Sequence, residues 1–228
     1  MSRRRVANPL ALAVLSCLWE RPMYPYEMTT SLRERGKEDS IRLNFGSLYA
    51  VIKSLEKHRL IEATHTEREG NRPERIVYAI TPEGRDEADE WLRELLSVPV
   101  KEYPAFETGL SLLPMLPPVD ATELLRGRVE RLDTDLRARA AQRVAPDVAY
   151  LPELFLVEFD YRVAMLQAER EFVAGLVARL ASGEFGGFGM WAQMHAAIAQ
   201  GSTPAELVTQ FDEYLAGLAG KEVPGPPA

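Results

Sequence analysis

Residues 40–84 limit the fold of this chain more than any other segment. An amphipathic pattern with helical period covers 44–59. A polar-edged strand pattern over 61–69 follows, then the pair Gly70-Asn71, which favours a tight turn, and then a second strand pattern over 75–80. A helix followed at once by a two-stranded hairpin predicts a winged helix-turn-helix. In such a fold the helix fits the major groove of DNA, and the hairpin reaches the phosphate backbone or the minor groove.

Three further helices are expected around this segment. Asn8 and Pro9 suit the start of a helix over 10–20, because they can fill the N-cap and first-turn positions. A second helix is expected over 24–35 on the basis of its apolar repeat. Thr81 can cap another helix directly after the hairpin.

The first residues also resemble a secretory signal, because three arginines precede an apolar run over 10–18. Five residues of this run, however, share one face of an amphipathic helix: Leu10, Ala13, Val14, Cys17 and Leu18. We therefore expect a helix of a cytoplasmic protein. Cys17 is the only cysteine, so no internal disulfide framework forms, and its place on the apolar face favours packing over catalysis. No stretch approaches the ~18 apolar residues of a membrane span.

The third expected helix has one face that suits packing and another that suits DNA. Its apolar stripe comprises Phe45, Leu48, Tyr49, Ile52 and Leu55. Short polar groups near a helix N-terminus suit groove contact, because the free N–H groups there favour phosphate. Side chains of the approach loop and of the hairpin tip can bind the DNA backbone. The candidate DNA-binding residues on this reasoning are Ser40, Arg42, Asn44, Ser47, Lys53, Arg68, Asn71 and Arg72. For Lys53, as for Lys57, a solvated helix face is the alternative.

The charge is distributed unevenly along the chain. The net charge is −7, but residues 1–80 hold 14 Lys and Arg against 10 Asp and Glu, whereas the remainder holds 13 against 24. A mildly basic front on an acidic body keeps DNA contact local. Glu67, Glu69 and Glu74 partly cancel the arginines beside the hairpin tip, so charge alone decides little.

Short strings in a fixed order along residues 8–96 form a joint pattern. They are Pro9-Leu-Ala-Leu-Ala-Val-Leu15, Tyr26-Glu27, Gly46-Ser-Leu-Tyr49, Leu55-Glu56, Leu60-Ile-Glu62, Asn71-Arg-Pro73, Tyr78-Ala-Ile-Thr81 and Glu83-Gly84. This pattern resembles the N-terminal domain of the phenolic acid decarboxylase repressor (PadR) family of transcriptional regulators. The resemblance implies a winged helix, a homodimer, palindromic operator DNA and usually repression. By position, Tyr49 matches the family's recognition-helix tyrosine and joins the candidate DNA-binding residues, while Arg72 matches its basic wing-tip residue.

Two positions depart from the family's pattern. The family usually has Gly where Pro25 and Arg59 stand. A left-handed helix cap is costly for an arginine. We therefore expect the end of the third helix to be shaped differently in this chain.

The longest helical pattern of the chain lies over 150–182. Apolar residues recur there in alternating steps of three and four, which forms a heptad seam interrupted by one charge, Arg170. Because reading a palindrome needs two-fold symmetry, we expect a second copy to cover at least part of this seam. Packing within the same chain is the alternative. The predicted dimerisation residues are Leu156, Phe159, Val163, Leu166, Val173, Val177 and Leu180.

Aromatic residues beyond the break at 183–187 suggest a site for a small-molecule effector. The candidate pocket residues are Trp191, His195, Phe211 and Tyr214, beside Met194. Core packing of the same side chains is the alternative. The three histidines lack metal-ligand spacing, so no metal or other cofactor is expected.

These patterns together predict a mainly helical α+β protein: an N-terminal winged helix-turn-helix followed by an all-helical C-terminal dimerisation domain. The expected parts are a DNA-binding domain (1–97), a dimerisation domain (98–182), a helical extension (183–223) and a disordered tail (224–228). The expected function is that of a bacterial, cytoplasmic DNA-binding regulator, in most such cases a repressor. Its expected partners are double-stranded DNA, a second copy and a small-molecule effector, without a membrane.

Two other classes of function compete with this one. A winged helix can serve as a protein-interaction module that does not bind DNA specifically, and the weak basic excess agrees with that alternative. An enzyme is the third class. The sequence offers no Ser-His-Asp arrangement, metal cluster or phosphate-cradling glycine loop in its support, so we expect no enzyme.

Overall fold

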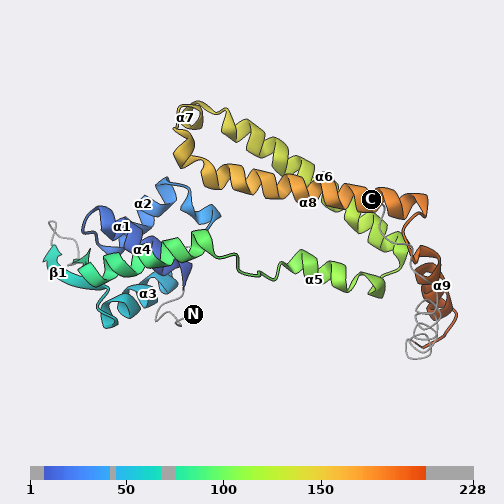
Figure 1. Cartoon of the computed structure of the whole chain (residues 1–228), viewed down its shortest axis with the longest axis horizontal. Coiled ribbons are helices and arrows are strands. Elements are labelled where there is room, and N and C mark those ends of the chain that lie inside the picture. The colour runs from blue at the N-terminus through green and yellow to red at the C-terminus, as the bar shows by residue number, and fades with distance from the viewer. Residues whose placement is uncertain (1–7, 42–44, 68–74, 204–228) are drawn as a thin grey trace. The chain divides into compact units, whose positions relative to one another are not determined.

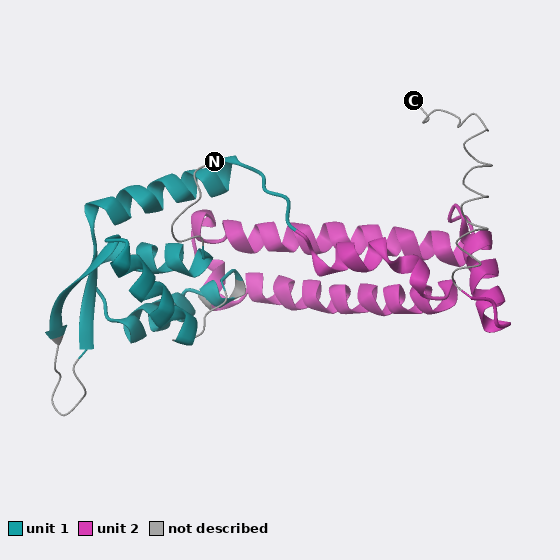
Figure 2. Cartoon of the chain, turned by 90° about the horizontal axis from the view of Figure 1, so that it is seen from below, with its two compact units in different colours: residues 1–102 teal, residues 103–228 magenta. Residues whose placement is uncertain are grey.

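The computed structural model describes residues 8–41, 45–67 and 75–203 of the 228-residue chain. The chain divides into two compact units, residues 1–102 and 103–228 (Figure 2). The model is mostly helical with one small two-stranded sheet, which confirms the expected fold class. None of the helices within the described ranges is long and apolar enough to cross a membrane.

The first unit contains four α-helices, one short 3-10 helix and a hairpin within its described residues (Figure 1). In chain order these are α1 (Pro9–Glu20), α2 (Pro25–Glu34), η1 (Lys37–Asp39), α3 (Phe45–Lys57), β1 (Ile61–Glu67), β2 (Arg75–Ile80) and α4 (Pro82–Ser97). Helix α1 is the centre of this unit, because it packs against α2, α3, α4 and β2. Seven of its twelve residues are buried, Cys17 among them. The expected start is confirmed: Asn8 Oδ1 accepts a hydrogen bond of 3.0 Å from the amide of Leu10.

The strands β1 and β2 form an antiparallel hairpin in which Ile61 lies opposite Ile80. A bulge at Thr64 interrupts the register, and the Thr64 hydroxyl donates a hydrogen bond of 3.1 Å to the carbonyl of Val77. Beyond the bulge Val77 is buried, whereas Ile76 is 47% exposed. The predicted Gly70-Asn71 turn lies outside the described residues.

The end of α3 corrects the expectation drawn from Arg59. This residue does adopt the left-handed conformation, with φ of +59°. The amide of Leu60 bonds to the carbonyl of Leu55 (2.9 Å), and the amide of Arg59 bonds to the carbonyl of Glu56 (2.9 Å). These two bonds form a Schellman motif with arginine in the position that usually holds glycine. The surrounding structure therefore imposes a backbone conformation that the arginine itself disfavours.

Thr81 holds this helix end in place from the start of α4. Its hydroxyl donates to the carbonyl of Arg59 (2.8 Å), and its amide donates to the carbonyl of Leu60 (3.1 Å). The same hydroxyl accepts a bond of 3.0 Å from the amide of Gly84, which caps α4 as predicted. Gly84 lies so close that a Cβ built on it would stand 2.0 Å from the carbonyl oxygen of Leu60. Only glycine fits this junction.

The second unit is helical throughout its described part. It consists of α5 (Ala105–Ser111), η2 (Leu113–Met115), α6 (Pro118–Arg143), α7 (Pro146–Ala149), η3 (Glu153–Phe155), α8 (Val157–Ser182) and α9 (Phe188–Ala199). The two 26-residue helices α6 and α8 lie side by side as an antiparallel pair (Figure 1 and Figure 2). Its core comprises Ala121, Leu125, Val173, Leu180 and Trp191, so α9 packs into the same core as α6 and α8.

Candidate nucleic-acid interface

Helix α3 presents a packed face and an exposed face. Leu48, Val51, Ile52 and Leu55 are buried in the core of the first unit. Tyr49 was placed in this apolar stripe from the sequence, but its side chain is 52% exposed. Each residue turns an α-helix by about 100°, so Tyr49 lies a quarter-turn from Leu48 and at the edge of the packed face. The exposed position agrees with the recognition-helix role that the family resemblance implies.

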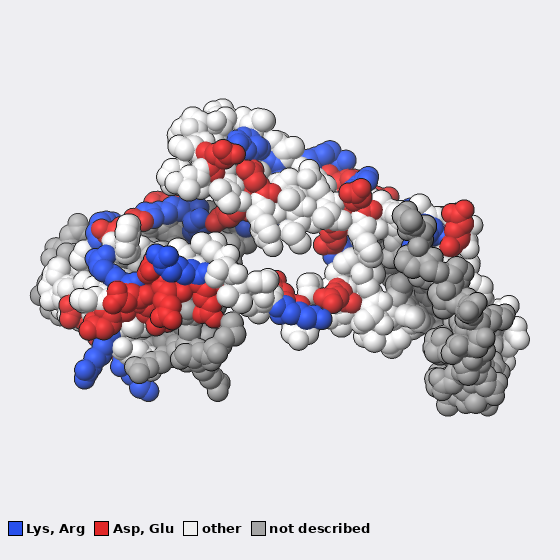
Figure 3. Space-filling model, in the orientation of Figure 1, with Lys and Arg blue, Asp and Glu red and all other residues white. Residues whose placement is uncertain are grey.

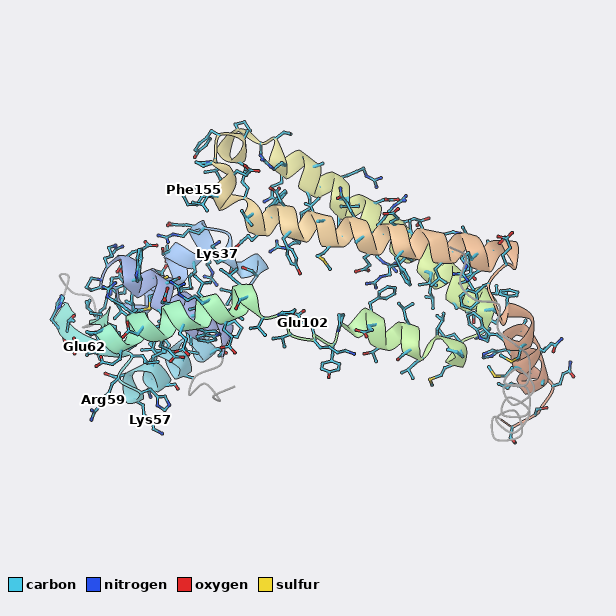
Figure 4. The ribbon with its side chains drawn as sticks, viewed as in Figure 1. Lys37, Lys57, Arg59, Glu62, Glu102 and Phe155 are labelled. Carbon is cyan, nitrogen blue, oxygen red and sulfur yellow. The ribbon has the colours of Figure 1, made fainter. Side chains whose placement is uncertain are left out.

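The exposed face of α3 carries two lysines, with the exposed Glu56 beside them. Tyr49, Lys53 and Lys57 are all exposed, and they follow one another at intervals of four residues. Within the described residues neither lysine forms an ion pair. Both ammonium groups are therefore available to a phosphate, and Figure 4 shows Lys57 at an outer edge of the first unit, close to Arg59.

The arginines of the neighbouring helices are, by contrast, already neutralised. Arg35 binds Glu20 through two hydrogen bonds, one of which is 2.7 Å long. The pKa of Glu20 is lowered, chiefly by this hydrogen bond. Arg21 pairs with Glu27, and Arg33 pairs with Glu38. Because these pairs cancel locally, the lysines of α3 contribute more to the field of the first unit than its total charge suggests.

Helix α4 turns a strongly acidic face to solvent, which Figure 3 shows as a red area over the first unit. Its acidic residues are Glu83, Asp86, Glu87, Asp89, Glu90 and Glu94. Between this helix and the end of α3 lies a hollow of about 800 Å³, lined by four glutamates and by His58 and Arg59. Such a surface repels phosphate, so this side of the unit is unfavourable for contact with DNA.

The remaining candidate DNA-binding residues are distributed as follows. Arg42, Asn44, Arg68, Asn71 and Arg72 lie outside the described residues. Ser40 is exposed after η1, and its hydroxyl donates to the carbonyl of Lys37 (3.4 Å). Ser47 is half-buried in α3. At the end of the strands nearest the hairpin tip, the guanidinium of Arg75 stacks 4.7 Å from the centre of the Tyr24 ring, which holds this arginine against the first unit.

Cys17 behaves as a packing residue. It is buried in α1, and burial raises the pKa of its thiol to about 11. A thiol with so high a pKa forms almost no thiolate near neutral pH, and the thiolate is the reactive form. Among the residues that the structure describes, no group of His, Cys, Asp and Glu could hold a metal ion.

Much of the predicted dimerisation seam packs within the chain itself. Leu156, Val173 and Leu180 are buried in the second unit, and Val177 packs against its core. Arg170, the single charge of the seam, bonds to Asp133 of α6 (2.8 and 3.3 Å). The seam therefore faces α6 over 170–180, as the intramolecular alternative held. Phe159, Val163 and Leu166 are half-buried, and their role in dimerisation stays a prediction.

A different face of α8 is apolar and exposed. It comprises Val157, Tyr161, Met165 and Phe172, each more than half exposed. Single exposed apolar residues are ordinary, but four at helical spacing along one helix indicate a contact surface. The sequence reasoning missed this stripe because the apolar residues of α8 cover nearly the whole circumference of the helix, so two seams could be drawn through them.

The described half of the predicted effector pocket is part of the core. Trp191 is 6% exposed, and its indole N–H donates to the carbonyl of Leu116 (2.8 Å). The rings of Phe185 and Phe188 meet it edge-on. His195 bonds through Nε2 to the carbonyl of Pro114 (2.9 Å). These contacts fix α9 to η2, while Phe211 and Tyr214 lie outside the described residues.

The central helix α1, helix α3 with its exposed face and the hairpin give the first unit a winged helix-turn-helix fold, and the second unit is helical. Residues 14–90 match the family described as "Transcriptional regulator PadR-like family", so the chain carries a PadR-like regulator domain, as the resemblance predicted. No curated protein sequence matches the chain.

Solved structures of PadR regulators share this fold. The PadR regulator of Bacillus subtilis in complex with operator DNA matches 76% of this chain and 99% of its own, with a TM-score of 0.57 and 17% identity. The same regulator in complex with p-coumaric acid matches 76% of this chain and 97% of its own, with a TM-score of 0.55 and 19% identity. The PadR-like regulator BC1756 of Bacillus cereus matches 76% of this chain and 98% of its own, with a TM-score of 0.52 and 18% identity. About a quarter of this chain lies outside each match.

Proposed function

We propose that this chain is a cytoplasmic bacterial transcriptional regulator that binds operator DNA through α3. The observation that carries the proposal is the exposed row of Tyr49, Lys53 and Lys57 on a helix whose other face is fully packed. The lysines supply sequence-independent attraction to phosphate, and Tyr49 is the side chain placed to meet base edges. The operator complex of the Bacillus subtilis regulator supports the same use of the fold.

The active form is a homodimer on a palindromic operator. Two copies would place two α3 helices in successive major grooves, about 34 Å apart on one face of the duplex. The exposed stripe of α8, with Tyr161, Met165 and Phe172, is the surface best suited to join the copies. The half-buried seam residues Phe159 and Val163 lie on the other side of α8 and do not extend this stripe.

Repression is the expected outcome of binding, because the family resemblance implies it. A small-molecule effector is expected to release the operator by favouring one dimer shape over another. The p-coumaric acid complex of the Bacillus subtilis regulator supports the expectation that this chain also binds a small-molecule effector, but it does not identify that effector.

Fluorescence anisotropy with the DNA upstream of the chain's own gene tests the proposal, with a scrambled duplex beside it. Lys53→Gln should weaken binding to both duplexes and lower the salt slope by about one unit for each phosphate contact that the substitution removes. Tyr49→Ala should weaken operator binding more than non-specific binding. The matched control is Arg85→Gln, which removes one exposed charge from the acidic side of α4 and should leave both affinities unchanged.

The dimer is tested separately by gel filtration with light scattering. Phe172→Asp should produce a monomer, whereas Glu171→Gln, at the neighbouring exposed position, should not. A wild-type chain that is monomeric at micromolar concentration contradicts the dimer. A chain that loses all duplex binding at modest salt would favour the alternative, a protein-interaction module. The acidic face of α4 would then be its most conspicuous docking surface.

A further inference from the structure

A groove of about 430 Å³ separates α6 and α8 toward the end where α7 and η3 join them. It lies entirely within the second unit and away from Trp191 and the rest of the predicted effector pocket. Its volume falls in the lower part of the range of small-molecule sites. No sequence pattern predicted it, because its residues come from two different helices, sixteen or more positions apart.

The floor of the groove is apolar. Leu136 of α6 faces Phe159 and Val163 of α8, and all three side chains are half-buried. Leu132, one turn before Leu136, is buried, so α6 and α8 are in full contact there. The groove between them opens toward α7 and η3. A ligand with an apolar body would bury surface on this floor that the chain itself leaves partly in water.

The rim of the groove is rich in arginine. Arg137, Arg139 and Arg143 line it from one stretch of α6, against the two carboxylates of Asp133 and Asp160. Among the residues that line the groove, cations therefore outnumber anions by one.

Both carboxylates already have arginine partners. Asp133 accepts hydrogen bonds from Arg170 of α8, so its charge is already compensated within the second unit. Arg143 and Asp160 approach only to 3.9 Å between Nε and Oδ1, which is an ion pair without a hydrogen bond. Arg143 can therefore turn its donors to an incoming oxygen while it keeps Asp160 nearby.

We propose that this groove binds a small organic anion with an apolar body, held by its carboxylate or sulfonate on Arg143 and by its hydrocarbon part on Phe159 and Leu136. A planar guanidinium matches a carboxylate in two parallel hydrogen bonds, which gives both strength and orientation. Gln167, at the same groove, adds an amide that can bond a second polar group on the ligand.

Occupation of the groove changes the spacing of α6 and α8. The exposed stripe of α8 lies on the same turns as Phe159, so a wedge between the helices also reorients Tyr161. This consequence rests on the proposed function: if α8 joins two copies, the anion changes the dimer shape and hence the operator affinity.

Isothermal calorimetry on the full chain tests the site with 2-naphthoate, which has an aromatic body and one carboxylate. Its neutral counterpart 2-naphthamide has nearly the same shape. One naphthoate should bind per chain, and naphthamide should bind about tenfold or more weakly, because it lacks the charge-assisted hydrogen bonds. Arg143→Gln should raise the dissociation constant of naphthoate by a similar factor and leave naphthamide unchanged. The matched control Arg131→Gln lies on the exposed surface of α6 outside the groove and should have no effect.

Phe159→Ala provides a second variant that tests the floor, since it should weaken both ligands. Circular dichroism checks that each variant remains folded. Equal binding of naphthoate and naphthamide, equal loss in Arg143→Gln and Arg131→Gln, or no saturable binding would overturn the site. Naphthoate binding that disappears as the chain associates would also overturn it, since a second copy would then occupy the groove.

Operator binding is measured without the ligand first, so failure of the site and failure of the proposed function are distinguishable. Naphthoate at saturation should then shift the operator affinity of the wild-type chain but not that of Arg143→Gln. Binding without such a shift overturns the regulatory consequence and leaves the site established.

Discussion

Arg59→Gly should stabilise this protein, although it replaces a surface arginine with the most flexible residue. Arg59 stands at φ of +59° with both Schellman bonds formed, so its conformation is imposed by the fold. A left-handed backbone costs an L-residue about 1–2 kcal/mol. The extra freedom of glycine in the unfolded chain costs about 0.4–1 kcal/mol in return. The free energy of unfolding should therefore rise by about 0.5–1 kcal/mol, which for a unit of this size raises Tm by roughly 2–8 °C.

Urea unfolding and thermal melts followed by circular dichroism measure this change. Lys57→Gly is the matched control, because it removes an exposed cation two residues earlier, where the backbone is helical. That variant should lose about 0.8–1 kcal/mol, the usual cost of glycine inside a helix. Arg59→Ala should change little, since alanine is strained in the same way. If Arg59→Gly destabilises the chain as much as Lys57→Gly does, the reasoning about strain at this helix end is wrong.

Three other perturbations have outcomes that the structure determines. Gly84→Ala should destabilise the chain by about 2–3 kcal/mol in urea unfolding, because the new methyl group would meet the carbonyl of Leu60. The hydrogen bond from Arg170 lowers the pKa of Asp133, so the stability it contributes is complete above the ordinary carboxyl pKa and is lost as the pH falls through the lowered value. The Tm difference between wild type and Asp133→Asn should accordingly vanish in strong acid. Cys17 should resist a thiol reagent at pH 8 in the folded chain and react after unfolding, and prompt reaction in the native state would contradict its burial.

The sequence predicted the elements of the first unit because each carries its own local signal. Asn8, Pro9 and Thr81 act on neighbouring backbone atoms, so their effect can be read without knowledge of the fold. The apolar period of α3 predicted the buried positions Leu48, Ile52 and Leu55 for the same reason.

The predictions from sequence failed where residues far apart in the chain determine the local structure or the packing partner. Arg59 is held by Thr81 across the hairpin, and no pattern within α3 reveals such a partner. Part of the α8 seam meets α6, and sequence alone cannot say whether α6 or a second copy meets such a seam. The arginines around the groove were overlooked because Arg137, Arg139 and Arg143 read as an ordinary charged helix face until Phe159 is placed opposite them.

Thr81 joins the end of α3 directly to the start of α4. Its hydroxyl bonds to the end of α3 while it caps α4, so the two helix ends are held together at one residue. Helix α4 extends sixteen residues from this junction, and Leu92 and Leu96 near its far end are exposed. A partner that bound those leucines would hold a helix whose other end is joined by hydrogen bonds to the end of α3.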